Sequence, residues 1–153
     1  MSTKTSSLED HFGYWLRMLS NEVSARFAVK LENHGVTVAQ WVVLRILFDQ
    51  KNATVVEVAS ALDIDKGAVS RMIDRLLKLG LVRREESPRS RREVALSLTP
   101  KAQSLVPRLA KAADENDREF FSVLNARQQT EFLKTIQLLI SSRVGTKPKP
   151  PTH

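Results

Sequence analysis

Residues 54–99 have the sequence TVVEVASALDIDKGAVSRMIDRLLKLGLVRREESPRSRREVALSLT, and this stretch decides the fold. Apolar residues at helical spacing predict a short helix over 55–62 and, after a tight turn, a second helix over 65–79 that ends at Gly80. The segments LVRREE and EVALSLT then flank the tip SPRSRR, which predicts a β-hairpin with Val94, Leu96 and Leu98 on its buried face. The stretch therefore predicts a helix, a turn, a helix and a hairpin in that order.

The same stretch holds most of the positive charge of the chain. Between residues 66 and 92, three acidic residues accompany nine basic ones, namely Lys66, Arg71, Arg75, Lys78, Arg83, Arg84, Arg89, Arg91 and Arg92. The difference is +6, whereas the whole chain of 153 residues carries +7. Charge that is concentrated in this way indicates a surface for a polyanion rather than a general property of the composition.

The second helix has one apolar and one polar face. The apolar face gathers Val69, Met72, Ile73, Leu76 and Leu79, and the polar face gathers Gly67, Ser70, Arg71, Asp74 and Lys78. In a helix-turn-helix, the N-terminal half of the second helix meets base edges in the major groove. We therefore predict that Arg71 contacts a base, that Ser70 contacts a base or a phosphate, and that Gly67 lets the helix approach the groove. Lys66 is expected at a phosphate, and Asp74 is expected to pair with a cation such as Lys78.

The hairpin tip supplies a second group of cations. Pro88 stiffens the tip, and Arg89, Arg91 and Arg92 are predicted to contact phosphates or the minor groove. A recognition helix beside such a hairpin is typical of a winged helix-turn-helix that binds double-stranded DNA.

Local signals mark where the other helices begin. Capping boxes are predicted for Thr37 with Gln40, Thr54 with Glu57, and Asn125 with Gln128, and Asp65 is expected to cap the recognition helix. Thr99 and Pro100 open a fifth helix that is expected to reach about residue 124, and a sixth is expected over about 126–142.

The first helix, expected over 8–33, is apolar on two sides. One stripe holds Phe12, Leu16, Leu19, Val23, Phe27 and Leu31, and Tyr14, Trp15 and Met18 widen it. Such a helix must pack against two surfaces, of which a partner subunit is the natural second. We predict a mainly helical single domain over 1–153, with dimerisation helices at 8–33 and 99–143, a winged helix-turn-helix lobe at 34–98 and a flexible tail at 144–153. A two-fold homodimer would place its recognition helices about 34 Å apart, which predicts an inverted-repeat operator.

Composition excludes several classes of function. The chain has no cysteine, which excludes disulfides, thiol redox switches and thiolate metal sites. Neither a signal peptide nor a membrane span is apparent, so we expect a cytoplasmic protein that does not bind membranes. No nucleotide-binding glycine loop, HExxH motif or recognisable catalytic triad occurs, and we predict that the chain is not an enzyme.

With these residues in view, the chain resembles MarR-family transcriptional regulators over nearly its whole length. The resemblance rests on TVAQWVVLRIL, on VVEVASALDIDKGAVSRMIDRLLKLGLVRR and on SPRSRREVALSLTPKAQ. It implies an obligate homodimer, a short palindromic site that is often near the regulator's own gene, and repression that a small ligand often relieves. Two positions depart from the family pattern. Ser90 stands where relatives usually have an Asp that orients the wing arginine, and Ala102 stands in place of a Gly.

The resemblance also implies a possible effector, since relatives often bind aromatic acids or phenols between the first helix and the DNA lobe. Trp15, Met18, Trp41 and Arg45 are the residues expected to line such a site, where Arg45 would meet a carboxylate. Ordinary core packing of the two tryptophans is the alternative. No cofactor or metal is expected, because a zinc site would require His11 or His34 to gather carboxylates such as Glu9, Asp10 or Glu32.

Two other functions compete with specific regulation. A non-sequence-specific architectural DNA-binding protein could use the basic wing together with Lys147 and Lys149 of the tail. A winged helix that binds proteins could use the apolar first helix, but it would not need the concentrated positive charge.

Overall fold

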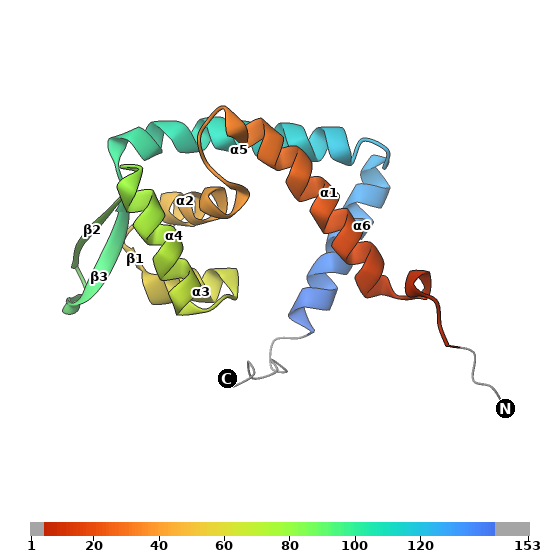
Figure 1. Ribbon diagram of the computed structural model, residues 1–153, viewed down its shortest axis with the longest axis horizontal. Helices are drawn as coiled ribbons and strands as arrows, with labels where there is room; N and C mark the ends of the chain where they lie inside the picture. Colours follow the sequence, from red (N-terminus) through yellow and green to blue (C-terminus); the bar gives the residue numbers. More distant parts are fainter. Residues whose placement is uncertain (1–4, 143–153) are drawn as a thin grey trace. The chain divides into compact units, whose positions relative to one another are not determined.

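The computed structural model of the chain describes residues 5–142 and divides it at Asn116 into two compact units. The elements in order are a 3-10 helix (Leu8–Asp10), α1 (Phe12–Glu32), α2 (Val38–Asp49), β1 (Ala53–Thr54), α3 (Val55–Leu62), α4 (Lys66–Lys78), β2 (Val82–Ser87), β3 (Ser90–Leu98), α5 (Pro100–Phe120) and α6 (Ala126–Ser141) (Figure 1). The tail predicted at 144–153 lies outside the described residues, and the single-domain organisation stays a prediction.

The helix starts predicted from capping residues are confirmed. Thr37, Thr54 and Asn125 each form a complete capping box with the residue three positions on. The Asp65 carboxylate accepts a hydrogen bond from the Ala68 N–H at 3.0 Å, which fixes the start of α4. Gly80, with φ of +67°, follows the end of α4 in the left-handed conformation that favours glycine.

The predicted hairpin is part of a three-stranded antiparallel sheet in the order β1-β3-β2. The sequence did not indicate β1, which pairs Ala53 with Leu96 and Thr54 with Ala95. The expected burial of Val94 is wrong, since 50% of this residue is exposed while Ala95 is fully buried. Val94 pairs with Glu86 one step beyond the end of β1, so it extends past the core that covers Ala95 and Leu96.

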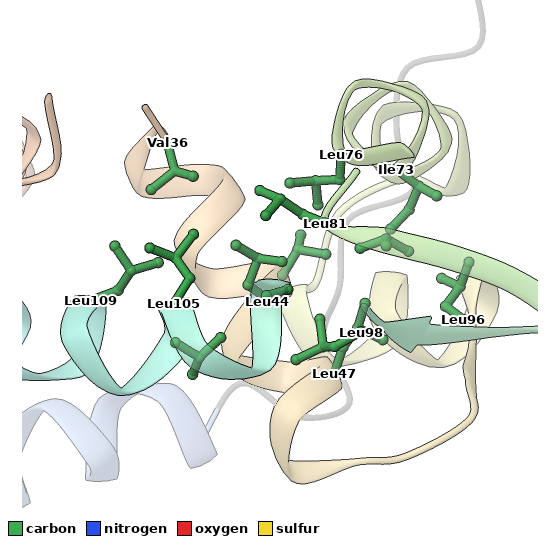
Figure 2. Packing of buried hydrophobic residues seen from close by; sticks show 14 of the residues in the cluster. Val36, Leu44, Leu47, Ile73, Leu76, Leu81, Leu96, Leu98, Leu105 and Leu109 are labelled. Carbon is green, nitrogen blue, oxygen red and sulfur yellow. The ribbon is translucent and has the colours of Figure 1, made fainter. Parts of the chain in front are cut away.

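The core of the first unit joins the helices to the sheet. Figure 2 shows leucines of α2 and α5, Ile73 and Leu76 of α4, and Leu96 and Leu98 of β3 gathered around one apolar centre. Val69, Ile73 and Leu76 are each 0% exposed, and they occupy the predicted apolar face of α4. Their burial directs the opposite face of α4 away from the core.

The first helix is shorter than predicted. A 3-10 turn occupies Leu8–Asp10, and α1 begins only at Phe12 because His11 is extended and interrupts the helical backbone. The N-terminal part of α1 is open to solvent in the single chain, where Phe12 is 88% exposed and Leu16 is 52% exposed.

The second unit contains the end of α5 and the whole of α6. The fifth helix ends at Phe120 rather than at residue 124, because the chain turns there before Asn125 caps α6. The Gln129 side-chain amide donates to the carbonyls of Phe121 and Leu124 at 3.1 and 3.0 Å and holds this turn. Among the described residues, no residue of α6 is buried.

We expect Ile73→Ala to destabilise the folded chain by about 2–5 kcal/mol, because it leaves a cavity where α4 meets the core. Urea denaturation followed by circular dichroism measures this loss. Val56→Ala on the exposed side of α3 is the control and should cost less than about 0.5 kcal/mol. An equal loss in the two variants would contradict the assignment of Ile73 to the core.

Candidate nucleic-acid interface

The exposed face of α4 carries the predicted DNA-binding residues of the helix. Lys66, Gly67 and Arg71 are exposed and Ser70 is half-buried, all in the first two turns of α4. Within residues 5–142, the side chains of Lys66 and Arg71 form no ion pair, so their charges are not neutralised by neighbouring side chains. The structure thus brings these four residues together on one surface at the N-terminal half of the helix.

Gly67 has a structural role besides the predicted one. A Cβ atom at this position would lie 2.9 Å from the Asp65 carboxylate oxygen that caps α4. A larger residue would therefore disturb the helix cap as well as fill the space next to a groove.

Asp74 is neutralised by a residue other than the one expected. Its carboxylate accepts a hydrogen bond from the Arg84 guanidinium of β2 at 2.7 Å instead of pairing with Lys78. Within β2, the Arg83 guanidinium forms an ion pair with the Glu85 carboxylate, with 3.6 Å between Nη2 and Oε1. The Asp74–Arg84 pair connects α4 to the wing and removes an isolated negative charge from the helix surface.

Arg89 at the wing tip is paired with Glu57 of α3. The guanidinium donates to Oε1 of Glu57 at 2.8 Å and to Oε2 at 2.9 Å, which is a two-pronged arrangement between residues far apart in the sequence. Sequence reasoning identified Glu57 only as a capping residue, because nothing local in the sequence indicates a contact with residue 89. A role of Arg89 in contacting DNA stays a prediction.

The pairing changes the acidity of Glu57. Hydrogen bonds from Arg89 and then from the Thr54 backbone N–H lower the pKa of this carboxyl from 4.5 to about 2. Burial opposes the shift, but the two hydrogen bonds outweigh it. Glu57 therefore keeps its negative charge throughout the neutral and mildly acidic range.

Arg91 and Arg92 lie in an irregular part of the wing. The β2–β3 ladder pairs Ser87 with Ser90 and then Glu86 with Val94, so residues 91–93 have no partner in the register. Both arginines are exposed, and within residues 5–142 their side chains form no ion pair. The Ser90 hydroxyl accepts a hydrogen bond from the Arg92 backbone N–H at 3.3 Å.

Three of the four predicted effector residues make a contact within the protein. The Trp15 indole N–H donates to the Glu9 carbonyl at 2.9 Å, and Trp41 packs edge-on against Phe27. The Arg45 guanidinium donates to Asp49 at 2.8 Å and lies over the ring of Phe48.

Met18, the fourth of these residues, is 44% exposed on α1. Two shallow cavities flank the Arg89–Glu57 pair, and a third is lined by residues of α2, β2, β3 and α5. Trp15, Met18, Trp41 and Arg45 line none of these three cavities, and the effector site stays a prediction.

Within residues 5–142, no group of three or more His, Cys, Asp or Glu side chains is arranged to hold a metal ion. None of the described helices combines the length and apolar character needed to cross a membrane.

The Arg89–Glu57 pair predicts a specific pH dependence. Because the folded-state pKa of Glu57 is lower than 4.5, the pair stabilises the fold above that pH and loses this effect as the pH falls towards about 2. Glu57→Gln should therefore be less stable than wild type by a constant amount from about pH 7 to 5.5, and the difference should shrink below pH 4.5. Urea denaturation of both chains across this range measures it. A difference that persists undiminished at pH 3 would contradict the assigned pKa.

Comparisons with known proteins agree with this architecture. Residues 36–94 match the MarR family. The chain is 30% identical to the HTH-type transcriptional regulator MgrA of Staphylococcus aureus over 110 residues, which are 71% of this chain and 75% of MgrA.

Two solved structures are similar over most of their length. Bordetella bronchiseptica BpsR, whose DNA binding is regulated by 6-hydroxynicotinic acid, has a TM-score of 0.82 at 27% identity, with 88% of this chain and 96% of BpsR covered. A mutant of Escherichia coli MarR complexed with operator DNA has a TM-score of 0.81 at 24% identity, and the match covers 88% of this chain and 99% of the MarR chain. This similarity confirms the fold. The prediction that the chain is not an enzyme is confirmed by its relatives, which are transcription regulators. The shared sequence and fold show that the chain belongs to the MarR family of DNA-binding winged helix-turn-helix transcriptional regulators.

Proposed function

We propose that the chain is a sequence-specific repressor that acts as a homodimer on an inverted repeat in double-stranded DNA. The observation that carries this proposal is the exposed polar face of α4, whose cations have no ion-pair partner within residues 5–142 and which lies opposite a fully buried apolar face. A helix held in this way presents a fixed set of donors to the major groove. The regulation of DNA binding in BpsR supports the same class of function.

The proposed contacts fall into two kinds. Ser70 and Arg71 read base edges from α4. Because Gly67 has no side chain, the backbone of α4 can approach these base edges closely. Lys66 contributes charge at the phosphates, and so do Arg91 and Arg92 of the wing. Base contacts would give the regulator its preference for one sequence, whereas phosphate contacts would strengthen binding to any duplex.

The homodimer is proposed from the apolar surface that the single chain leaves exposed. On α1, Phe12 and Leu16 are more than half exposed, and on α6 Leu138 and Ile140 are each 66% exposed. Apolar surface of this extent is typical of an interface rather than of a monomer. A second copy of the chain is the partner that an inverted-repeat site requires.

A small aromatic acid is the proposed effector class. BpsR responds to 6-hydroxynicotinic acid, and the predicted residues Trp15, Met18, Trp41 and Arg45 offer rings and a cation for such a compound. Binding at Arg45 would require its guanidinium to exchange Asp49 for the ligand's carboxylate.

Arg71→Ala and Arg91→Ala separate the two kinds of contact. Loss of Arg71 should reduce discrimination between the preferred site and random DNA by about 1–3 kcal/mol. Loss of Arg91 should weaken both complexes similarly and lower the slope of log affinity against log salt by about one unit. Fluorescence anisotropy at several salt concentrations measures both quantities. If Arg71→Ala weakens binding to the preferred site and to random DNA by the same factor, Arg71 does not read bases.

Leu16→Arg tests the proposed dimer. A charge in the exposed N-terminal part of the apolar stripe of α1 should give monomers, detected by light scattering, that bind the inverted repeat poorly. Leu16→Ala keeps the surface apolar and serves as the matched control, which should remain dimeric. An intact, DNA-binding dimer of Leu16→Arg would refute this interface.

A further inference from the structure

We propose that Arg89 and Glu57 form a latch that positions the wing for DNA, and that Arg89 is a positioning residue rather than a DNA contact. This inference rests on the proposed function, because it assigns Arg91 and Arg92 to the DNA. It differs from the sequence-based expectation that all three wing arginines bind DNA alike.

The Glu57 carboxylate, which accepts the hydrogen bonds from Arg89, is also held in place by contacts that do not involve Arg89. Oε2 of Glu57 accepts a hydrogen bond from the Thr54 N–H at 2.8 Å, while the Thr54 hydroxyl accepts one from the Glu57 N–H at 3.2 Å. Thr54 also belongs to β1 and pairs with Ala95 of β3. The carboxylate is therefore tied to the sheet and to the start of α3 at the same time.

The donor side is held at the tip of the hairpin. Ser87 is buried, and its hydroxyl accepts a hydrogen bond from the Arg89 backbone N–H at 3.2 Å. From this turn the Arg89 side chain reaches back to α3 and donates to both carboxylate oxygens. A guanidinium that makes two parallel hydrogen bonds with one carboxylate is fixed in direction as well as in distance.

The wing needs such a contact because its ladder is incomplete. Residues 91–93 have no partner on β2, so regular strand pairing does not determine where Arg91 and Arg92 point. The latch fixes residue 89, two positions before Arg91, against the helix-turn-helix. The Glu57 carboxylate of α3 is the acidic partner that the structure gives to the tip of the wing.

The two possible roles of Arg89 predict opposite effects of Glu57→Gln. If Arg89 bound DNA directly, Glu57 would compete for it and repel phosphates, so removing the negative charge would strengthen binding. If the latch positions the wing, the same change weakens binding although every cation remains. Gln preserves an acceptor for the Thr54 N–H, which keeps the start of α3 intact.

The experiment uses the full chain and a duplex that the wild-type chain selects from random-sequence DNA. We expect Glu57→Gln and Arg89→Gln each to weaken binding by about threefold or more, and the double variant to bind no more weakly than either one, since coupled residues are not additive. The salt slope of Glu57→Gln should fall by about one unit, because Arg91 or Arg92 leaves its phosphate. Glu86→Gln removes a wing carboxylate that has no ion-pair partner within residues 5–142, and it should bind as tightly as wild type or more tightly.

Hydrogen exchange of the DNA-free chain tests the latch independently of any DNA. Backbone amides of residues 87–94 should exchange faster in Glu57→Gln and in Arg89→Gln than in wild type, and not in Glu86→Gln. If the wild-type chain selects no DNA, the proposed function fails while the exchange result still decides whether the latch holds the wing. Unchanged binding or tighter binding in Glu57→Gln, additive losses in the double variant, or unchanged exchange would each overturn the proposal.

Discussion

The burial of one face of α4 is the constraint on which the rest of the interface depends. Val69, Ile73 and Leu76 have no exposed surface, and turning the helix about its axis would bring them into water at about 1.5–3 kcal/mol each. The polar face is fixed by the same packing, because the two faces belong to one rigid helix. Asp65 at its start and Gly80 after its end limit its length. The core thus determines which donors α4 presents to solvent.

Ion pairs divide the basic residues of this lobe into two groups. Of the nine cations between residues 66 and 92, Arg83, Arg84 and Arg89 are paired with carboxylates. The other six form no ion pair within residues 5–142 and include Lys66 and Arg71. Exposed pairs add little to the free energy of folding, so their effect lies in orientation. Arg84 connects the wing to α4, and Arg89 connects the tip of the wing to α3. The cations without an ion-pair partner therefore belong to elements that these two pairs connect.

Interactions between residues close together in the sequence could be predicted, whereas interactions between distant residues could not. The capping boxes and the apolar face of α4 depend on residues three or four positions apart, and they are present as predicted except at Leu79. Leu79 lies just beyond the end of α4 and is 41% exposed. The strand β1 has two residues and no periodicity, so only its partner β3 reveals it. The contact between Glu57 and Arg89 spans 32 positions and had no local signal. The sequence predicts a cation beside Asp74 but favours the nearby Lys78, whereas the observed partner is Arg84 on the adjoining strand.

Selection from a pool of random-sequence duplexes tests the central claim that the exposed faces of α4 and the wing recognise a specific DNA sequence as a pair. The bound DNA is recovered and sequenced, and the number of chains per duplex is measured by light scattering. We predict enrichment of an inverted repeat whose half-sites are centred about one helical turn, or roughly 10 base pairs, apart and are bound by two chains. Binding that enriches no sequence over the starting pool would contradict this claim and would favour an architectural role.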